Sequence, residues 1–266
     1  MPIQGPVVVV ADQPPPDLVK ALSAAGAFPV LESPAAQAAE AIAAANPSAA
    51  ILIHDGGLDA ATMAALEAIA YQQQPLLPIF ARIATDLRFA HAGLLPLAAN
   101  LDIQCLVACL QSALRVRASH AAVLGRIDIL KGRGVALPDF PDTDPLEDAT
   151  VLVVGRSRSY PELSTAIGNQ AGLIGALSLE TAARNLKSRV VDGIAIGDGF
   201  SPRMIGAFLT VLAEDSRFRD LPVAMLSNTG FDFESLLPNF STHNDIGILV
   251  DHLMPYVRLQ AFEMRI

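Results

Sequence analysis

The sequence has few of the residues that mark several classes of protein. Tryptophan is absent, there are only 2 cysteines, and charged residues make up 17% of the 266-residue chain. Two cysteines cannot build the disulfide framework of a small secreted domain. The N-terminus also lacks the basic region that begins a signal peptide. We therefore expect a cytoplasmic protein whose thiols are reduced.

Positive charge and long apolar runs are scarce as well. Lysine and arginine total 18 against 27 aspartates and glutamates, which gives a net charge of −9. Proteins that bind nucleic acids or anionic membranes need a clustered basic surface, so no nucleic acid is expected as a partner. No uncharged apolar stretch reaches the roughly 18 residues that a transmembrane helix requires. We therefore expect no association with a membrane.

The hydrophobic residues, 52% of the chain, follow an internal repeat. Three landmarks of the first half recur in the second half at an offset of 143 or 144 residues: Val7–Val10 with Val151–Val154, Leu77–Phe80 with Leu221–Ala224, and Ile53–Asp55 with Ile196–Asp198. A nearly constant offset over most of each half indicates two copies of one fold.

Each copy alternates short β-rich runs with helical patterns. In the first copy we expect strands at 6–11, 28–31, 49–54, 76–81 and 94–98, and helices at 16–25, 35–45, 58–72, 85–91 and from 100. In the second copy we expect strands at 150–155, 173–176, 192–197 and 221–226, and helices at 160–170, 178–187, 201–214 and from 244. This order predicts an α/β protein with two tandem doubly wound, five-stranded parallel-sheet domains. The first domain spans 1–132, a linker spans 133–149, and the second domain spans 150–266.

The closing helix of each copy has a longer apolar stripe than one small domain can cover. In the first copy the stripe continues past Arg117 through Val123, Leu124, Ile127 and Leu130. In the second copy the helical pattern still holds at Ile266. Such stripes form helix–helix interfaces, so we expect a homodimer through the closing helices. We also expect the natural chain to continue into an output domain.

The order of the elements, the aspartates at strand ends and the run from Leu221 to Ser227 resemble the receiver domains of two-component response regulators. This resemblance implies a flavodoxin-like fold. Receivers have an acidic pair after the first strand, which holds Mg²⁺, and a phosphoacceptor aspartate after the third strand. They also have a serine or threonine after the fourth strand and a lysine after the fifth, which bind the phosphoryl oxygens.

Neither copy matches the receiver site completely. The first copy has Asp12 as half of the acidic pair and Asp55 as the candidate phosphoacceptor, but no hydroxyl after its fourth strand. The second copy has Arg156 in place of the acidic pair, Asp198 as the candidate phosphoacceptor and Ser227 after the fourth strand. None of the chain's lysines lies near the end of a fifth strand. Asp12 and Asp55 are the candidate ligands for Mg²⁺, and no cofactor is expected.

The tandem arrangement and the run Leu253–Ala261 resemble the input half of receiver–receiver–GGDEF diguanylate cyclases, whose receivers dimerise. The GGDEF signature is absent here, so the chain itself is not expected to be an enzyme or to make cyclic di-GMP. Residues Arg217–Asp220 spell the R-x-x-D of the inhibitory site in that family, which we interpret as a coincidence.

The run after the first strand of the second copy and the two cysteines each allow a functional interpretation. Residues Gly155–Ser159 could cradle a phosphate, but they lack the glycine-rich patterns of nucleotide-binding loops. We instead hypothesise that Arg156 pairs with Asp198 and neutralises it, and that Asp198 caps the following helix. Cys105 and Cys109 have a spacing that permits metal binding, but packing in the core is the better interpretation.

The sequence thus favours a non-enzymatic regulatory module of a two-component or cyclic di-GMP signalling protein. Its tandem degenerate receivers would mediate dimerisation and control a downstream output domain. A GGDEF domain is the first candidate for that output domain. Two alternatives remain open. One is a working phosphoswitch, in which a histidine kinase phosphorylates Asp55 or Asp198. The other is a Rossmann-like protein that binds a small molecule.

Overall fold

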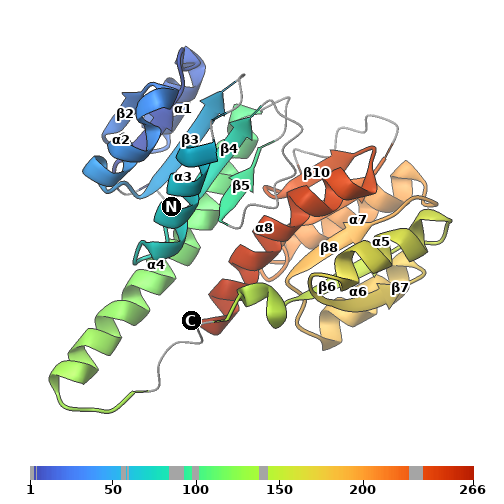
Figure 1. Ribbon diagram of the computed structural model, residues 1–266. Coiled ribbons are helices and arrows are strands. Elements are labelled where there is room, and N and C mark those ends of the chain that lie inside the picture. Colours follow the sequence, from blue (N-terminus) through green and yellow to red (C-terminus); the bar gives the residue numbers. More distant parts are fainter. Residues whose placement is uncertain are drawn as a thin grey trace. The chain divides into compact units, whose positions relative to one another are not determined.

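The chain folds into two compact units, Met1–Pro141 and Asp142–Arg265, in a computed structural model. The structure describes residues 3, 5–54, 58, 60–83, 93–97, 102–137, 143–227 and 236–266. Figure 1 shows the elements of each unit. The predicted helix at 85–91 and the candidate phosphoacceptor Asp55 lie outside the described residues.

The first unit is a five-stranded sheet with helices between its strands (Figure 1). Its strands pair in parallel in the order β2-β1-β3-β4-β5. The elements are β1 (Val7–Val10), α1 (Pro16–Ala24), β2 (Val30–Ser33), η1 (Ala35–Gln37), α2 (Ala38–Ala45), β3 (Ala49–His54), α3 (Ala60–Gln72), β4 (Ile79–Ile83), β5 (Leu94–Pro96) and α4 (Ile103–Gly132).

The second unit repeats this topology, with its strands parallel in the order β7-β6-β8-β9-β10. The elements are η2 (Pro145–Glu147), β6 (Thr150–Val154), α5 (Ser159–Gly168), β7 (Gly172–Ala176), α6 (Leu179–Ser188), β8 (Gly193–Ile196), α7 (Pro202–Glu214), β9 (Val223–Leu226), β10 (Phe240–His243) and α8 (Ile246–Arg265). Both sheets have the flavodoxin-like order 2-1-3-4-5, so the predicted fold class is confirmed.

Proline determines where three of the strands begin. The predicted strands at 28–31, 76–81 and 221–226 start two or three residues later in the structure, directly after Pro29, Pro78 and Pro222. Proline has no N–H to donate to the ladder, so each ladder starts at the next residue. The proline carbonyls still take part, because they accept N–H groups of neighbouring strands at 3.0, 3.0 and 2.9 Å.

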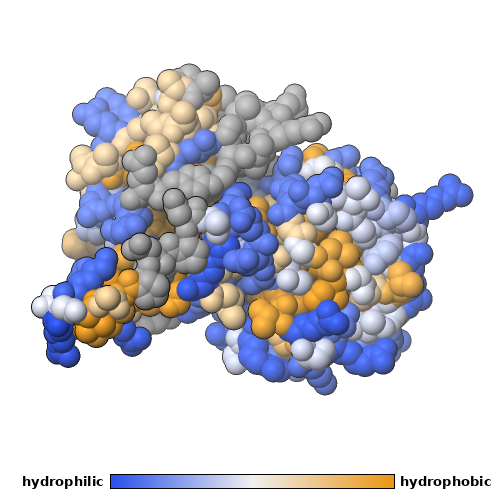
Figure 2. Space-filling view, turned by 60° about the horizontal axis from the view of Figure 1, so that its bottom comes forward, coloured by the Kyte–Doolittle hydropathy of each residue, from blue (hydrophilic) through white to orange (hydrophobic). Residues whose placement is uncertain are grey.

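Each sheet is covered on both faces, which explains why its strands are continuous apolar runs. In the second unit Leu152 and Val154 pack with α6 and α7. Val151 and Val153 point to the other face and pack with α5 and α8. In the first unit β1 packs against α2 and α3 in the same way. The outer surface mixes hydrophilic residues with scattered hydrophobic ones (Figure 2).

Helix α4 runs unbroken for 30 residues, which confirms the predicted continuation past Arg117 (Figure 1). Asp102 caps its start by accepting the Gln104 N–H at 3.0 Å. The helix has apolar or buried residues at alternating spacings of four and three: Cys109, Ala113, Val116, His120, Val123, Ile127 and Leu130. The first four are buried and the last three are half-buried. None of the described helices is long and apolar enough to cross a membrane.

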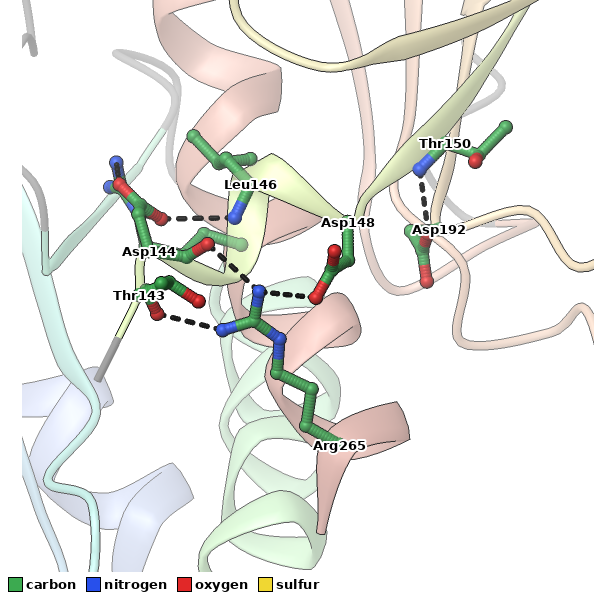
Figure 3. Close-up of polar contacts among 8 residues, drawn as sticks. Thr143, Asp144, Leu146, Asp148, Thr150, Asp192 and Arg265 are labelled. Atoms are coloured by element: carbon green, nitrogen blue, oxygen red, sulfur yellow. Dashed lines mark hydrogen bonds and ion pairs between the residues drawn. The ribbon is translucent and has the colours of Figure 1, made fainter. Parts of the chain in front are cut away.

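Two arginines of α8 bind the segment that leads into β6, and Figure 3 shows the contacts of one of them, Arg265. Arg265 donates to the carbonyl oxygens of Thr143 and Asp144 at 2.7 and 3.0 Å and to the Asp148 carboxylate at 2.6 Å. Arg258 donates twice to the Asp144 carboxylate, both times at 2.9 Å. Burial alone would raise the pKa of Asp144, but the hydrogen bonds from Arg258 and the Leu146 N–H, together with the charges of Arg258 and Arg265, outweigh it and lower that pKa. Residues 143–149, assigned to the linker by sequence pattern, are thus part of the second unit.

Candidate functional site

The strand register fixes how the two copies correspond. Val10 of β1 lies beside Leu52 of β3. Val154 of β6 lies beside Ile196 of β8. The offset between the copies is therefore 144 residues on both strands. Residues just beyond these positions, at the carboxyl edge of each sheet, form the site that flavodoxin-like folds use for ligands.

The constant offset corrects one sequence alignment. It places His54, and not Asp55, at the position equivalent to Asp198. It also makes Asp12 the counterpart of Arg156. The match of Ile53–Asp55 with Ile196–Asp198 at an offset of 143 rested on identical residue types. It is shifted by one residue relative to the hydrogen-bond ladder. The two copies thus have opposite charges at one of these equivalent positions, Asp12 in the first and Arg156 in the second.

In the first unit Asp12 contacts an imidazole. Its Oδ2 lies 3.3 Å from Nδ1 of His54, and its Oδ1 accepts the Ala35 N–H at 3.4 Å. Ala11, the other residue at the acidic-pair position, is buried. The neighbouring strand pairs His54 with Ile83, which has no hydroxyl. This edge therefore holds one carboxylate against one imidazole, while Asp55 lies outside the described residues.

In the second unit Asp198 is held by two serine hydroxyls. Its Oδ1 accepts from the Oγ atoms of Ser157 and Ser159, which lie 3.2 Å from each other. These bonds outweigh burial and lower the pKa of Asp198, so the carboxylate is ionised at neutral pH. Both serines belong to the run that sequence reading considered as a phosphate cradle. The structure places the protein's own carboxylate against those hydroxyls.

Arg156 points away from Asp198. Its Nε donates to the Leu177 carbonyl oxygen at 3.2 Å, and its guanidinium carbon lies 4.9 Å from the centroid of the Phe200 ring. No ion pair between Arg156 and Asp198 is present in the described residues, so the hypothesised pair does not form. Asp198 does not cap α7 either, because that helix begins after Ser201.

Ser227 lies at the same level as Asp198 on the neighbouring strand. Ile196 pairs with Met225, and both candidate residues come two positions later. The Ser227 N–H donates to the His243 carbonyl oxygen at 2.8 Å, which fixes the backbone here. On the fifth strand of this sheet the same level is occupied by Asn244, where a receiver has its lysine.

Sequence reading missed a group of rings between β10 and α8. The His243 and His252 ring centroids are 4.7 Å apart, and Tyr256 stacks on His252 at 5.7 Å. Nε2 of His243 lies 2.9 Å from the Ser241 hydroxyl. Burial lowers the pKa of His243 to about 4. Burial, and then the charge of His243, lowers the pKa of His252 to about 3, so both rings are neutral at pH 7.

The remaining motifs make the following contacts in the structure. The pKa of Cys109 is raised by a hydrogen bond with Cys105 and by burial, so this thiol stays protonated. Within the described part of the chain no three His, Cys, Asp or Glu residues gather as a metal site. Arg217 of the R-x-x-D run binds Asp215 at 2.7 Å, and its guanidinium lies over Phe218.

No protein-family model and no curated protein matches the chain. Among solved structures, it is similar to the receiver domain of a histidine kinase from Syntrophus aciditrophicus, at 17% identity and a TM-score of 0.35 over 41% of this chain and 89% of that one. A response regulator receiver from Methanoculleus marisnigri is 22% identical, with a TM-score of 0.30 over 35% and 82% of the two chains. A sugar-binding protein from Salmonella typhimurium is 12% identical, with a TM-score of 0.28 over 96% and 87%. Likenesses at this level concern the fold alone.

Proposed function

We propose that this chain is a non-enzymatic regulatory module of a signalling protein. Its two receiver-like units act as degenerate receivers, which transmit a signal by dimerising rather than by accepting a phosphoryl group. The module is cytoplasmic, pairs through its closing helices and controls a downstream output domain, for which a GGDEF domain is the first candidate.

The observation that carries the proposal is the charge arrangement at Asp198. A receiver needs a second carboxylate near its phosphoacceptor, because Mg²⁺ takes hard oxygen ligands. Here that position holds Arg156, whose positive charge opposes a divalent cation. The Asp198 carboxylate is already bound by Ser157 and Ser159. The fifth strand supplies no lysine to neutralise a phosphoryl group. If Asp198 attacked a phosphodonor, this site would therefore offer neither a second carboxylate to hold a metal nor a lysine to neutralise the phosphoryl oxygens.

The first unit supports the same conclusion by a different route. Its Asp12 lies against His54, and imidazole nitrogen is a poor ligand for Mg²⁺. His54 also occupies the position of the phosphoacceptor in the hydrogen-bond register. Among the described residues at this edge, one carboxylate with an imidazole neighbour does not make the oxygen-rich site that the metal requires.

One observation favours a second candidate, a phosphoswitch at Asp198. The carboxylate is exposed and ionised at neutral pH, as a nucleophile must be. Ser227 lies at its level on the next strand, where a receiver has the hydroxyl that binds the acyl phosphate. A histidine kinase would be the phosphodonor in this case, with Asp55 as the alternative acceptor.

Incubation with acetyl phosphate and Mg²⁺, followed by intact-mass spectrometry, distinguishes the two candidates. We expect the wild-type chain to show no phosphoryl adduct, because the described residues of neither unit assemble a metal site around a carboxylate. The variants Asp55→Asn and Asp198→Asn serve as matched controls, since each removes one candidate acceptor and preserves its shape. An adduct on the wild type that one of these substitutions abolishes would refute the proposal and identify the acceptor.

The dimer makes a separate prediction on α4. We expect Ile127→Asp to convert a dimer into a monomer, because a charge on the apolar stripe would be buried in the helix–helix interface. Ala122→Asp places the same charge on the same helix at an exposed position and is expected to leave the dimer intact. Sedimentation velocity of both variants and the wild type measures the outcome. A monomeric wild type would exclude dimerisation through this helix.

A further inference from the structure

The strand β7 forms an open edge of the second unit's sheet. Within the part of the chain that the structure describes, β7 pairs with β6 alone and ends its sheet. Residues 169–179, which contain β7, include no charged residue and no proline. Natural proteins protect their edge strands with charges, prolines or bulges, because an open edge recruits further strands.

The equivalent edge strand of the first unit, β2, carries two of these protections. The registers of β1 with β2 and of β6 with β7 make Pro29 equivalent to Gly172 and Glu32 equivalent to Gly175. Where β2 has a proline and a charge, β7 therefore has two glycines. The two units share one fold, so the fold itself does not require an open edge at β7.

The backbone groups on the outer side of β7 belong to Leu173 and Gly175. The N–H of Gly172 and the C=O of Ala176 bind residues at the two ends of β6, at 2.8 and 3.0 Å. Alternate residues of a strand in a parallel ladder turn their N–H and C=O groups to the same side. Ile174 therefore faces β6 as well, and the N–H and C=O groups of Leu173 and Gly175 point away from the sheet.

Contacts at both ends of this edge limit where a new strand can bind. The Leu177 carbonyl oxygen accepts Nε of Arg156 at 3.2 Å. The Ala171 N–H donates back into α5 at 3.0 Å. Among the described residues between these ends, the outward groups open to a new strand are those of Leu173 and Gly175.

We propose that β7 pairs with β7 of a second copy of this chain, antiparallel and about a two-fold axis at Ile174. In this register Leu173 of each copy lies opposite Gly175 of the other, and each such pair exchanges two hydrogen bonds. A register shifted by two residues in either direction would need the occupied N–H of Ala171 or the occupied C=O of Leu177. The open groups of β7 are thus complementary to themselves.

Side chains and charge also favour a second copy as the occupant. Leu173 is 38% exposed, and the glycine opposite it leaves room for its side chain. The Tyr160 side chain lies where a side chain on Gly175 would be, so Leu173 of one copy would pack against Tyr160 of the other. Two chains of net charge −9 repel each other, and an uncharged edge is where their approach costs least.

An interface of four hydrogen bonds and a few side chains is small and belongs to the weak, transient class. We therefore expect this pairing at protein concentrations of about 100 μM, whereas dilute solutions report the α4 interface alone. The inference goes beyond the proposed function, because it uses the second unit only. Where α4 pairs as well, two different two-fold interfaces would link chains into linear assemblies.

Cysteine cross-linking of the full chain at about 100 μM tests the register. Ile174→Cys places two thiols at the two-fold axis, in a pair whose Cα atoms lie about 4.5 Å apart, which a disulfide can bridge. Leu173→Cys places the Cα atoms about 8 Å apart, which is beyond that reach. We expect Ile174→Cys to form a covalent dimer at least about fivefold faster than Leu173→Cys, although Leu173 is the more exposed residue.

Leu31→Cys is the matched control. Leu31 has the position on β2 that Ile174 has on β7, and it is 39% exposed, so random collision would favour it. We expect it to cross-link as slowly as Leu173→Cys. Equal rates in the three variants, or no covalent dimer from Ile174→Cys, would overturn the proposal. Adding Ile127→Asp to Ile174→Cys should leave cross-linking unchanged, so a failure of the α4 interface does not affect this test.

A charge on the edge provides a second test that needs no oxidation. Leu173→Glu places a carboxylate in the paired edge, whereas Leu31→Glu makes the same change at a residue of nearly equal exposure on β2. Sedimentation equilibrium between about 10 and 300 μM measures the weight-average mass. We expect this mass to rise with concentration in the wild type and in Leu31→Glu, and to stay constant in Leu173→Glu. A constant mass in the wild type, or an equal rise in Leu173→Glu, would contradict the pairing.

Discussion

Replacing Gly193 by alanine is expected to lower the free energy of unfolding of the second unit by about 1–3 kcal/mol. A Cβ added at Gly193 of β8 would lie 2.5 Å from Cγ2 of Val257 and 3.4 Å from Cγ of Pro222. Val257 is fully buried on α8 and, being β-branched, cannot rotate away at low cost. The extra methyl group must therefore push α8 away from the sheet. Hydrogen exchange of β6 and β8 amides in increasing urea reports this unit alone.

A double-mutant cycle tests the reason for that loss. Val257→Ala alone is expected to cost about 2 kcal/mol, because it removes two buried methyl groups and leaves a cavity. In the Gly193→Ala, Val257→Ala double variant the new Cβ occupies part of that cavity. The double variant should then be more stable than the sum of the single effects by about 1 kcal/mol or more. Strict additivity would show that Gly193 is required for its backbone and not for the approach of α8.

Much of the fold could be read from the sequence because parallel strands buried on both faces are unmistakable apolar runs. β1 and β6 begin and end within a residue of their predicted positions for this reason. Strand starts were displaced where Pro29, Pro78 and Pro222 remove a donor from the ladder. β10 was missed, because Phe240–His243 has two polar residues and one histidine among its four and shows no apolar run.

The site was harder to predict, because it depends on side-chain directions that no pattern encodes. Arg156 and Asp198 were expected to pair because Arg156 takes the place of the acidic pair that lies near the phosphoacceptor in receivers. The structure directs the guanidinium to Leu177 and Phe200 and gives the carboxylate to two serines. The place of His54 was also out of reach, since letter matching tolerates a shift of one residue that a hydrogen-bond ladder does not.

The histidines of the second unit make its stability depend on pH. Folding lowers the pKa of His243 from 6.5 to about 4. Folding lowers the pKa of His252 from 6.5 to about 3. The unfolded chain therefore binds protons more tightly than the folded one between these values. The stabilisation that the neutral rings allow is complete above pH 6.5 and is lost as the pH falls toward 4. The Ser241 hydroxyl and Tyr256 ring beside them carry no charge that would compensate.

We expect the second unit to lose about 1–3 kcal/mol of unfolding free energy between pH 7 and pH 5, because both rings keep pKa values below 5 in the folded state. His252→Phe keeps an aromatic ring against Tyr256 but cannot titrate, so it should remove about half of that loss or more. His54→Gln removes a histidine from the first unit and should leave the pH dependence of the second unit unchanged. Urea-dependent hydrogen exchange of β9 and β10 amides at the two pH values measures the effect. If the unfolding free energy of His252→Phe fell between pH 7 and pH 5 as much as that of the wild type, solvent would have to reach the ring pair in the folded state. Only a desolvated imidazole resists protonation at pH 5.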